Sequence, residues 1–429
     1  MSTDQAFVPL TIERPVAGGD MLARHEGRVV FVRGVIPGER VMARIVRQTK
    51  GVAWAELHKI LEPSPDRRSS PVDPACGGAY FAHMSPERQR ALKADIIADA
   101  FRRIGKHPLA EPPRVAGSPE HGYRLRARLH VRDRQVGFFR EGTHTLCDAG
   151  PSGQLREDSL VAARAVVNAL GRRADDCDAL TLAEDVAGRS RIVHLEARPG
   201  ATLEDLDGPS LLLDGISGAT ASAGRRVFTL AGLPIVTDTA RDLFGGDSPI
   251  DSGVRWSRHA TSFFQANRFL AGAVVRRVLS IIDGDVVADL YSGVGLFAVA
   301  LGARGSHVLA VEGDASSGGD LAVNAHPLAD RIDVVQSSVE SAVARLPPPG
   351  LDAIVIDPPR TGLTSEARRG VVAWRPRRVV YVSCDPPTLA RDAAGLFAAG
   401  YQLQGIEAFD FFPNTPHVET LAVFDLTPP

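Results

Sequence analysis

The sequence predicts an α/β protein in three parts: a small N-terminal β-barrel, an α+β middle domain and a C-terminal doubly wound domain. Three observations predict this division. Short β-like segments between Gly and Pro turns fill residues 7–62. Residues 154–245 mix helix and strand patterns without a chemical motif, and strands then alternate with helices as in a mostly parallel sheet. The expected domain boundaries are 1–62, 63–245 and 246–429.

The composition is that of an ordinary globular protein, with 429 residues, 44% hydrophobic and 23% charged. No apolar run of about 18 residues occurs, so no membrane-spanning helix is expected. The first ten residues lack a basic start followed by an apolar core, so no secretory signal is expected. The four cysteines, without disulfide spacing, indicate a reducing cytoplasm. They are Cys76, Cys147, Cys177 and Cys384.

The N-terminal segments alternate as barrel strands do. In residues 39–46, Val41, Ala43 and Ile45 share one side, and mostly polar residues take the other. Such a barrel, with its several arginines, can bind RNA or DNA. The same fold class also serves as a plain structural module, so both interpretations remain open.

The middle region carries an excess of positive charge. Residues 63–140 hold fifteen lysines and arginines against eight acids. A helix is predicted over 86–104, followed by a hairpin over 122–148, because residues 123–132 alternate strictly. One face of that strand presents a row of arginines, which suits RNA phosphates, although a solvated surface is the alternative. The row consists of Arg124, Arg126, Arg128 and Arg132.

The C-terminal domain places polar residues at the ends of its predicted strands, where open α/β sheets bind ligands. A strand over 379–383 ends at Cys384, and Pro386 and Pro387 force the chain to turn. A buried structural cysteine is the alternative, but the double proline argues against a packed core position. The other predicted strands are 286–291, 307–311, 332–336, 352–356 and 421–424.

The first strand of this domain leads into a glycine turn that contains Gly293 and Gly295. A strand, a Gly-x-Gly turn and a helix form a nucleotide-binding arrangement, but the third glycine of a dinucleotide site is absent. The next strand ends in Glu312, whose carboxylate can accept hydrogen bonds from ribose hydroxyls. With Asp289 before the turn, this pairing of acids resembles class I methyltransferases, which bind S-adenosylmethionine.

The fourth strand ends in Asp357, Pro358, Pro359 and Arg360. This sequence resembles the Asp/Asn-Pro-Pro motif of methyltransferases that act on planar nitrogen or nucleobase atoms. Arg360 stands where the amino-methylating enzymes carry an aromatic residue, which argues against methylation of an exocyclic amine.

Three further segments complete a family resemblance. They are Ser-Phe-Phe-Gln-Ala-Asn at 262–267, the segment around Cys384 at 383–392, and Asp-Phe-Phe-Pro-Asn-Thr-Pro-His-Val-Glu-Thr at 410–420. With the Asp-Pro-Pro-Arg segment they resemble the RNA 5-methyluridine methyltransferase family, in this order and at these strand ends. The resemblance covers essentially the whole chain, and the N-terminal barrel looks like the TRAM domain of some members.

The resemblance implies a mechanism, because carbon 5 of uracil is too weak a nucleophile to take a methyl group directly. A thiolate, here Cys384, adds to carbon 6, and a base, here Glu419, later removes the proton from carbon 5. The base must leave its stack to reach the thiol. The resemblance and the glycine turn imply a set of donor-binding residues: Gln265, Tyr291, Gly293, Gly295, Glu312 and Asp357. The expected RNA-binding residues are Arg124, Arg126, Arg128, Phe263 and Arg360.

The chain departs from the family at an iron–sulfur cluster that many members hold through four cysteines. Of the corresponding positions only Cys76 is a cysteine, because Ser70, Ala79 and Ser152 occupy the others. One thiolate cannot hold such a cluster, so neither a cluster nor any metal is expected.

The resemblance therefore predicts an S-adenosylmethionine-dependent RNA uracil-5 methyltransferase. Within that family the barrel favours ribosomal RNA over tRNA, because the tRNA-specific bacterial members usually lack it, although archaeal-type tRNA enzymes have it. A cytoplasmic monomer without membrane contact is expected. Cytosine-5 methylation uses the same thiol addition and is one alternative, although the Glu419 segment favours uracil. An RNA-binding assembly factor with a vestigial methyltransferase domain is the other, and the retained Cys384, Glu419 and Asp357 argue against it.

Overall fold

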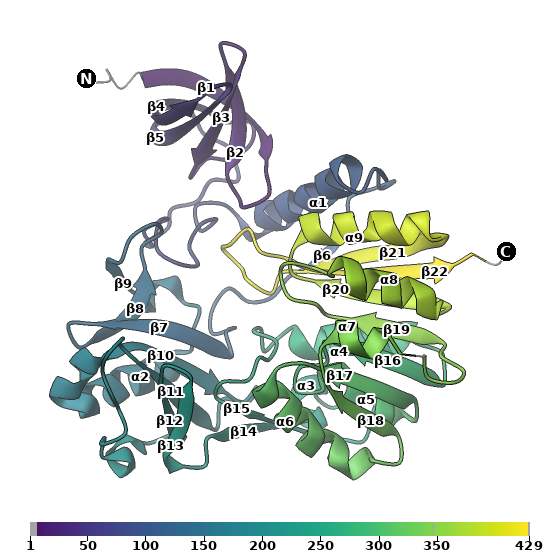
Figure 1. Cartoon of the computed structure of the whole chain (residues 1–429). Coiled ribbons are helices and arrows are strands. Elements are labelled where there is room, and N and C mark those ends of the chain that lie inside the picture. The colour runs from purple at the N-terminus through teal and green to yellow at the C-terminus, as the bar shows by residue number, and fades with distance from the viewer. Residues whose placement is uncertain (1–6, 346, 428–429) are drawn as a thin grey trace.

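The computed structural model describes residues 7–345 and 347–427 (Figure 1). The expectation of no secretory signal falls partly on residues 1–6, outside this range. The N-terminal unit is a closed barrel with strand order β1-β2-β3-β5-β4, so the predicted barrel is confirmed. Its strands are β1 (Phe7–Pro15), β2 (Met21–His25), β3 (Arg28–Arg33), β4 (Arg40–Thr49) and β5 (Val52–Glu62).

The middle unit is a seven-stranded sheet in the order β13-β12-β11-β10-β7-β8-β9, with α2 (Glu157–Leu170) packed on one face. Most of its pairings are antiparallel, and β11 with β12 is parallel. The strands are β7 (Arg126–Arg132), β8 (Gln135–Phe139), β9 (Leu146–Asp148), β10 (Cys177–Glu184), β11 (Arg191–Ala197), β12 (Ile216–Ala223) and β13 (Arg226–Gly232). Short 3-10 turns are η1 (Gly150–Ser152), η2 (Gly171–Asp176) and η3 (Gly208–Leu211).

The arginine strand begins later than the sequence predicts. β7 starts at Arg126, and Arg124 instead lies in the preceding segment, where it forms an isolated bridge with Asn267 of the C-terminal unit. The expectation that Arg124 belongs to the row on the strand face is therefore wrong. The side chain of the neighbouring Tyr123 is fully buried, which holds this segment between two units rather than in the hairpin.

A small two-stranded sheet of β14 (Ile235–Thr239) and β15 (Arg255–His259), with α3 (Ala240–Phe244) between them, leads into the C-terminal unit. The main sheet there runs β18-β17-β16-β19-β20-β22-β21-β6. Its first five strands are parallel, and β22 pairs antiparallel with both β20 and β21. The predicted doubly wound sheet is confirmed. The strands are β16 (Val286–Leu290), β17 (His307–Glu312), β18 (Ile332–Gln336), β19 (Ala353–Ile356), β20 (Arg378–Ser383), β21 (Tyr401–Phe409), β22 (Glu419–Leu426) and β6 (Val115–Ala116).

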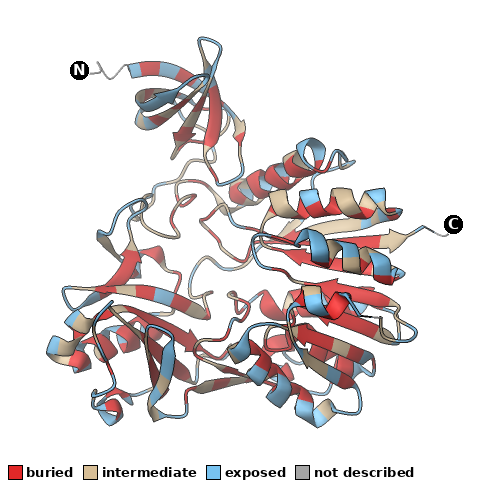
Figure 2. Ribbon diagram, in the orientation of Figure 1, coloured by how far each residue is buried: buried red, intermediate tan, exposed pale blue. Residues whose placement is uncertain are grey.

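Helices cover both faces of this sheet, and each buries its apolar side. Figure 2 shows the central strands β16, β19 and β20 mostly buried and the helices banded between buried and exposed residues. The helices α4, α5 and α6 share one core with the sheet, and α1, α7, α8 and α9 share the core of the other face. Their bounds are α1 (Pro86–Arg103), α4 (Ala271–Ile281), α5 (Leu296–Arg304), α6 (Ala315–Ala325), α7 (Val339–Val343), α8 (Ser365–Trp374) and α9 (Pro386–Ala398), with a 3-10 turn η4 (His326–Leu328).

Two segments from the range predicted for the middle domain pack with the C-terminal sheet. Helix α1 lies beside α9, and β6 pairs in parallel with β21 at the outer end of the sheet (Figure 1). The N-terminal part of the chain therefore completes the C-terminal unit. Among the described residues no helix is long and apolar enough to cross a membrane.

Candidate active site

The carboxyl ends of β16, β17, β19 and β20 surround a cavity of about 620 Å³, and the start of β22 completes it. Nine residues that the sequence singles out line this cavity: Phe263, Gln265, Tyr291, Gly293, Glu312, Asp357, Arg360, Cys384 and Glu419. They come from positions up to 156 residues apart in sequence, and the sheet brings them to one edge. Phe264, Phe297, Asp314 and Phe412 also line the cavity. Among these, only Phe264 and Phe412 fall in segments that the sequence resemblance marks.

Backbone N–H groups of the glycine turn and of the loop after β17 hold the carboxylate of Glu312. The N–H of Gly293 donates to Glu312 Oε2 at 2.8 Å, and Asp314 N–H donates to the other oxygen at 2.6 Å. Tyr291 has a φ of 62° and Gly293 one of 56°, so the chain turns sharply after β16. Gly295 does not line the cavity. It has a φ of 88° and precedes α5, so its role is to shape the turn.

A second polar pair crosses the cavity floor. Gln265 Nε2 donates to Asp357 Oδ2 at 3.1 Å. Burial raises the pKa of Asp357 to about 7. Asp289 lies behind the turn, fully buried, with its Oδ1 lacking a hydrogen-bond partner among the described residues. Burial and the charge of Asp357 raise the pKa of Asp289 to about 8, although the Ala298 N–H opposes the shift. The cavity therefore concentrates carboxyl groups, which favours a cationic ligand.

Cys384 follows β20 directly and precedes α9, whose first turn is capped by the Asp385 side chain. The thiol is half-buried. Burial raises its pKa to about 11, and the charges of Glu419 and Asp357 add to the shift, whereas Arg360 opposes it. The isolated site therefore holds Cys384 as a thiol at neutral pH.

Glu419 opens β22 and is only 4% exposed. Its Oε1 is buried without a hydrogen-bond partner among the described residues. Burial, followed by the charge of Asp357, raises the pKa of Glu419 well above its usual value, and Arg360 opposes this. An unpartnered carboxyl oxygen in a cavity shared with a thiol is suited to exchange a proton with a ligand.

The predicted arginine row lies outside the cavity lining. Arg124 donates to Gln154 Oε1 at 2.7 Å and to the Arg126 carbonyl, and its guanidinium lies over the Phe138 ring. Arg128 is paired with Glu196 at 2.7 Å and with Asp178. Arg126 Nε is buried without a hydrogen-bond partner among the described residues.

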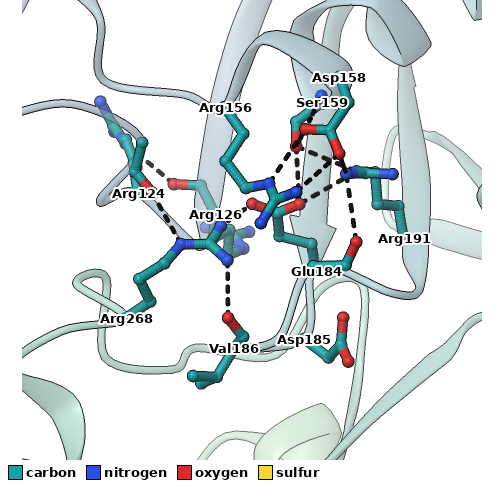
Figure 3. Close-up of polar contacts among 12 residues, drawn as sticks. Arg124, Arg126, Arg156, Asp158, Ser159, Glu184, Asp185, Val186, Arg191 and Arg268 are labelled. Carbon is teal, nitrogen blue, oxygen red and sulfur yellow. Dashed lines mark hydrogen bonds and ion pairs between the residues drawn. The ribbon is translucent and has the colours of Figure 1, made fainter.

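A buried ionic cluster joins the middle unit to the segment that carries Gln265 (Figure 3). Glu184, at the end of β10, accepts hydrogen bonds from Arg191 and from Arg268, which lies three residues after Gln265. Arg268 also donates to the carbonyls of Val186 and Gly122, at 2.7 Å each. The middle sheet thereby fixes one wall of the cavity.

The expectation about cysteine pairing is wrong, because Cys76 and Cys147 form a disulfide with Cα atoms 6.0 Å apart. The two residues are 71 positions apart in sequence, so spacing alone could not reveal the pair. They meet because Cys76 bridges to Arg140 just after β8, while Cys147 lies on β9 opposite Phe138 of β8. With Cys76 in a disulfide and Ser70, Ala79 and Ser152 at the other positions, the residues present do not fit an iron–sulfur cluster.

The chain is similar in sequence and fold to known RNA-modifying enzymes. A family model described as tRNA (Uracil-5-)-methyltransferase matches residues 250–425. The chain is 34% identical to the 23S rRNA (uracil(1939)-C(5))-methyltransferase RlmD of Bordetella avium, over 94% of this chain and 88% of that protein. It is 33% identical to an uncharacterized RNA methyltransferase of Streptomyces coelicolor, over 96% of this chain and 91% of that protein.

A solved structure shares the fold over nearly the whole chain. It is the Pyrococcus abyssi tRNA (uracil-54, C5)-methyltransferase in complex with S-adenosyl-L-homocysteine, with a TM-score of 0.75 and 22% identity. The match covers 97% of this chain and 99% of the other.

Proposed function

Because this chain belongs to the RNA uracil-5 methyltransferase family, we propose that it methylates carbon 5 of a uridine in ribosomal RNA through a covalent adduct with Cys384. The observation that carries the proposal is the presence of Cys384 and the unpartnered carboxyl group of Glu419 in one cavity. The resemblance to RlmD enzymes over most of the chain favours ribosomal RNA over tRNA.

The proposed reaction assigns a distinct step to each residue. The Cys384 thiolate adds to carbon 6, which places a nucleophilic enolate at carbon 5. S-adenosylmethionine supplies the methyl group that carbon 5 accepts. Glu419 then takes the proton from carbon 5, the bond between carbon 6 and sulfur breaks, and the thiolate is released. The raised pKa of Glu419 suits this role, because a carboxylate whose pKa is raised by burial is a stronger base.

The donor fits the cavity because its sulfonium is a cation and the cavity concentrates acids. We assign it to Gln265, Tyr291, Gly293, Glu312 and Asp357, with Gly295 shaping the turn. Glu312 is held by two N–H groups, so its carboxylate is pre-oriented toward a ribose. A bound cation beside Asp357 and Glu419 also offsets the charges that keep Cys384 protonated.

The RNA is expected to approach across the mouth of the cavity. Phe263 is 60% exposed there although it is a large apolar residue, which suits stacking on an extruded base. Arg360 is exposed at the same mouth and suits a phosphate. We further propose RNA contacts for Arg124, Arg126 and Arg128 and for the TRAM-like barrel (1–62), with 63–245 as the middle domain and 246–429 as the methyltransferase domain. We propose that the protein acts as a monomer in the cytoplasm, where ribosomal RNA is modified. The Cys76–Cys147 disulfide removes cysteine spacing as an argument for this compartment.

The test uses the full-length protein, tritiated S-adenosylmethionine, and ribosomal RNA and tRNA that lack 5-methyluridine. Methylation of one uridine in ribosomal RNA, abolished by Cys384→Ala with RNA binding retained, is the expected result. Undiminished product from Cys384→Ala would contradict the covalent route. Methylated cytosine would support the cytosine-5 alternative, and RNA binding without methyl transfer to any RNA would support an assembly factor.

A further inference from the structure

We propose that Gln89 and Lys93 of α1 are positioning residues for the step in which Glu419 removes the proton from carbon 5. The inference rests on the proposed function. It concerns a helix more than 300 residues away in sequence from the base, and neither side chain lines the cavity. Both act on the segment 410–418, which connects β21 to Glu419 and is called the base loop below.

Lys93 holds the beginning of the base loop. It is fully buried, and its ammonium group donates to the carboxylate of Asp410 and, at 3.1 Å, to the carbonyl of Phe412. Burial lowers the pKa of Lys93, and Asp410 opposes that shift. Phe412 lines the cavity, so Lys93 reaches the active site through one intervening residue.

Gln89 holds the middle of the same loop, one helical turn before Lys93. It is 1% exposed and contacts Asn414 twice: Asn414 N–H donates to Gln89 Oε1 at 2.7 Å, and Gln89 Nε2 donates to Asn414 Oδ1 at 2.9 Å. Asn414 has a φ of 65°, a conformation that non-glycine residues rarely adopt. The paired contacts stabilise this turn, which directs the chain back toward Glu419.

Packing alone does not explain why positions 89 and 93 are polar. The buried side of α1 is otherwise apolar, with Leu92, Ile96 and Ile97 at helical spacing. Leucine or methionine at positions 89 and 93 would fill the same space without the desolvation cost of a buried amide and ammonium. The Gln89 amide also donates to the carbonyls of Phe81 and Met84, before α1. The other hydrogen bonds of the two polar groups go to the backbone and side chains of the base loop.

The base loop also has contacts outside α1. The N–H of Phe81 donates to the Asn414 carbonyl at 2.7 Å, and Arg68 donates to Asn414 Oδ1 at 2.9 Å. A side chain at Gly19 of the barrel would lie 2.7 Å from Pro416. Because these contacts already tether the loop, losing Gln89 shifts the loop rather than releasing it. The expected defect is therefore a misplaced Glu419 in an otherwise assembled cavity.

The proposed mechanism predicts a measurable product of this defect. Adduct formation needs Cys384, but release of the methylated RNA needs Glu419. A misplaced base therefore leaves methylated RNA attached to the protein as a product that survives denaturing electrophoresis. The ratio of attached to released tritiated RNA does not depend on the fraction of active protein, so partial unfolding does not change it.

The experiment compares Gln89→Leu with wild type, Glu419→Gln and a control, Arg102→Gln. Arg102 lies in the last turn of α1 with its side chain 61% exposed and does not touch the base loop. Gln89→Leu is expected to lower kcat more than 10-fold, to change KM for RNA and donor less than 3-fold, and to raise the attached fraction toward that of Glu419→Gln. Arg102→Gln is expected to match wild type.

A second variant tests Lys93 without leaving an unpaired buried charge. The double variant Lys93→Met with Asp410→Asn removes both charges together and is expected to raise the attached fraction as well. If both variants lose attached and released RNA in equal proportion, or match wild type, the inference is wrong while the proposed function stands. If wild type forms neither species with any RNA, the proposed function itself fails.

Discussion

The thiol of Cys384 and the carboxyl group of Glu419 face the same cavity, and a charge on Glu419 raises the pKa of the thiol. The proposed nucleophile and the proposed base are therefore electrostatically linked before any ligand binds. Each must lose its proton for the proposed reaction, yet the two negative charges oppose each other.

Removing the Glu419 charge is expected to make Cys384 more acidic. In Glu419→Gln the pH midpoint for alkylation of Cys384 by iodoacetamide should shift below the wild-type value of about 11. Mass spectrometry of the Cys384 peptide separates its alkylation from that of Cys177, which is buried and has a pKa raised to about 12. An unchanged midpoint would show that the Glu419 charge does not reach the thiol.

The raised pKa of Cys384 also determines how kcat/KM of the wild-type enzyme depends on pH. In the proposed reaction only the thiolate adds to carbon 6. Because the pKa of Cys384 is raised, kcat/KM should rise steadily from pH 6.5 to 9.5. The raised pKa of Glu419 acts in the same direction, because the base must also be unprotonated. A plateau of kcat/KM below pH 7.5 would contradict a raised pKa of the Cys384 thiol in the free enzyme.

Replacing Glu312 by glutamine is expected to weaken donor binding by about 10- to 100-fold, the worth of a charged hydrogen bond of about 1.5–3 kcal/mol. The variant also disturbs the Gly293 N–H contact at 2.8 Å. Calorimetric titration with S-adenosylhomocysteine measures the effect. Glu366→Gln, on the surface of α8 with its side chain 58% exposed, serves as control and should bind normally.

Asp289→Asn is expected to stabilise the protein at alkaline pH. The folded-state pKa of Asp289 is about 8, whereas the carboxyl group of an unfolded chain titrates near pH 3.9. Between these values the folded protein binds a proton that the unfolded chain does not, so its stability falls as pH rises through this window. The variant lacks this loss, which is at most about 1.4 kcal/mol per pH unit. Urea denaturation at pH 5 and pH 8 should show the stability of wild type falling relative to that of the variant between these two values.

The disulfide is expected to contribute measurably to stability. Closing a loop with a sequence separation of 71 residues constrains the unfolded chain by about 4 kcal/mol in the chain-entropy model. Cys147→Ser should therefore lower the free energy of unfolding by a similar amount, and dithiothreitol should have the same effect on wild type only. Thiol titration in denaturant should find Cys177 and Cys384 reactive and the other two cysteines silent until a reductant is added. Four reactive thiols at the outset would contradict the pairing.

Local patterns predict much of the site. Glu312 ends an apolar strand, Cys384 directly follows one, and Gly293 lies in the turn after another. A residue at such a position lies at the carboxyl edge of the sheet, whatever the rest of the fold. The closed barrel and the doubly wound sheet are likewise predicted from strand spacing and turns.

Features that depend on distant pairing are not visible in local patterns. Strand β6 has two residues and no periodicity, and its partner β21 includes polar residues and a glycine. The Cys76–Cys147 pair and the contact of Gln89 with Asn414 join segments 71 and 325 residues apart. Arg124 continues the alternation of β7 in sequence, but its contact with Asn267 removes it from the strand.

The pairing of β6 with β21 bears on how the chain acquires its structure. During synthesis β6 emerges almost 300 residues before its partner β21. This edge of the sheet can therefore form only after β21 has been synthesised. A fragment beginning at residue 246 would expose the edge strand β21 and the apolar surface under α1, both of which favour aggregation. The motifs of the methyltransferase region thus lie in one continuous segment, but the folded unit also needs α1 and β6 from earlier in the chain.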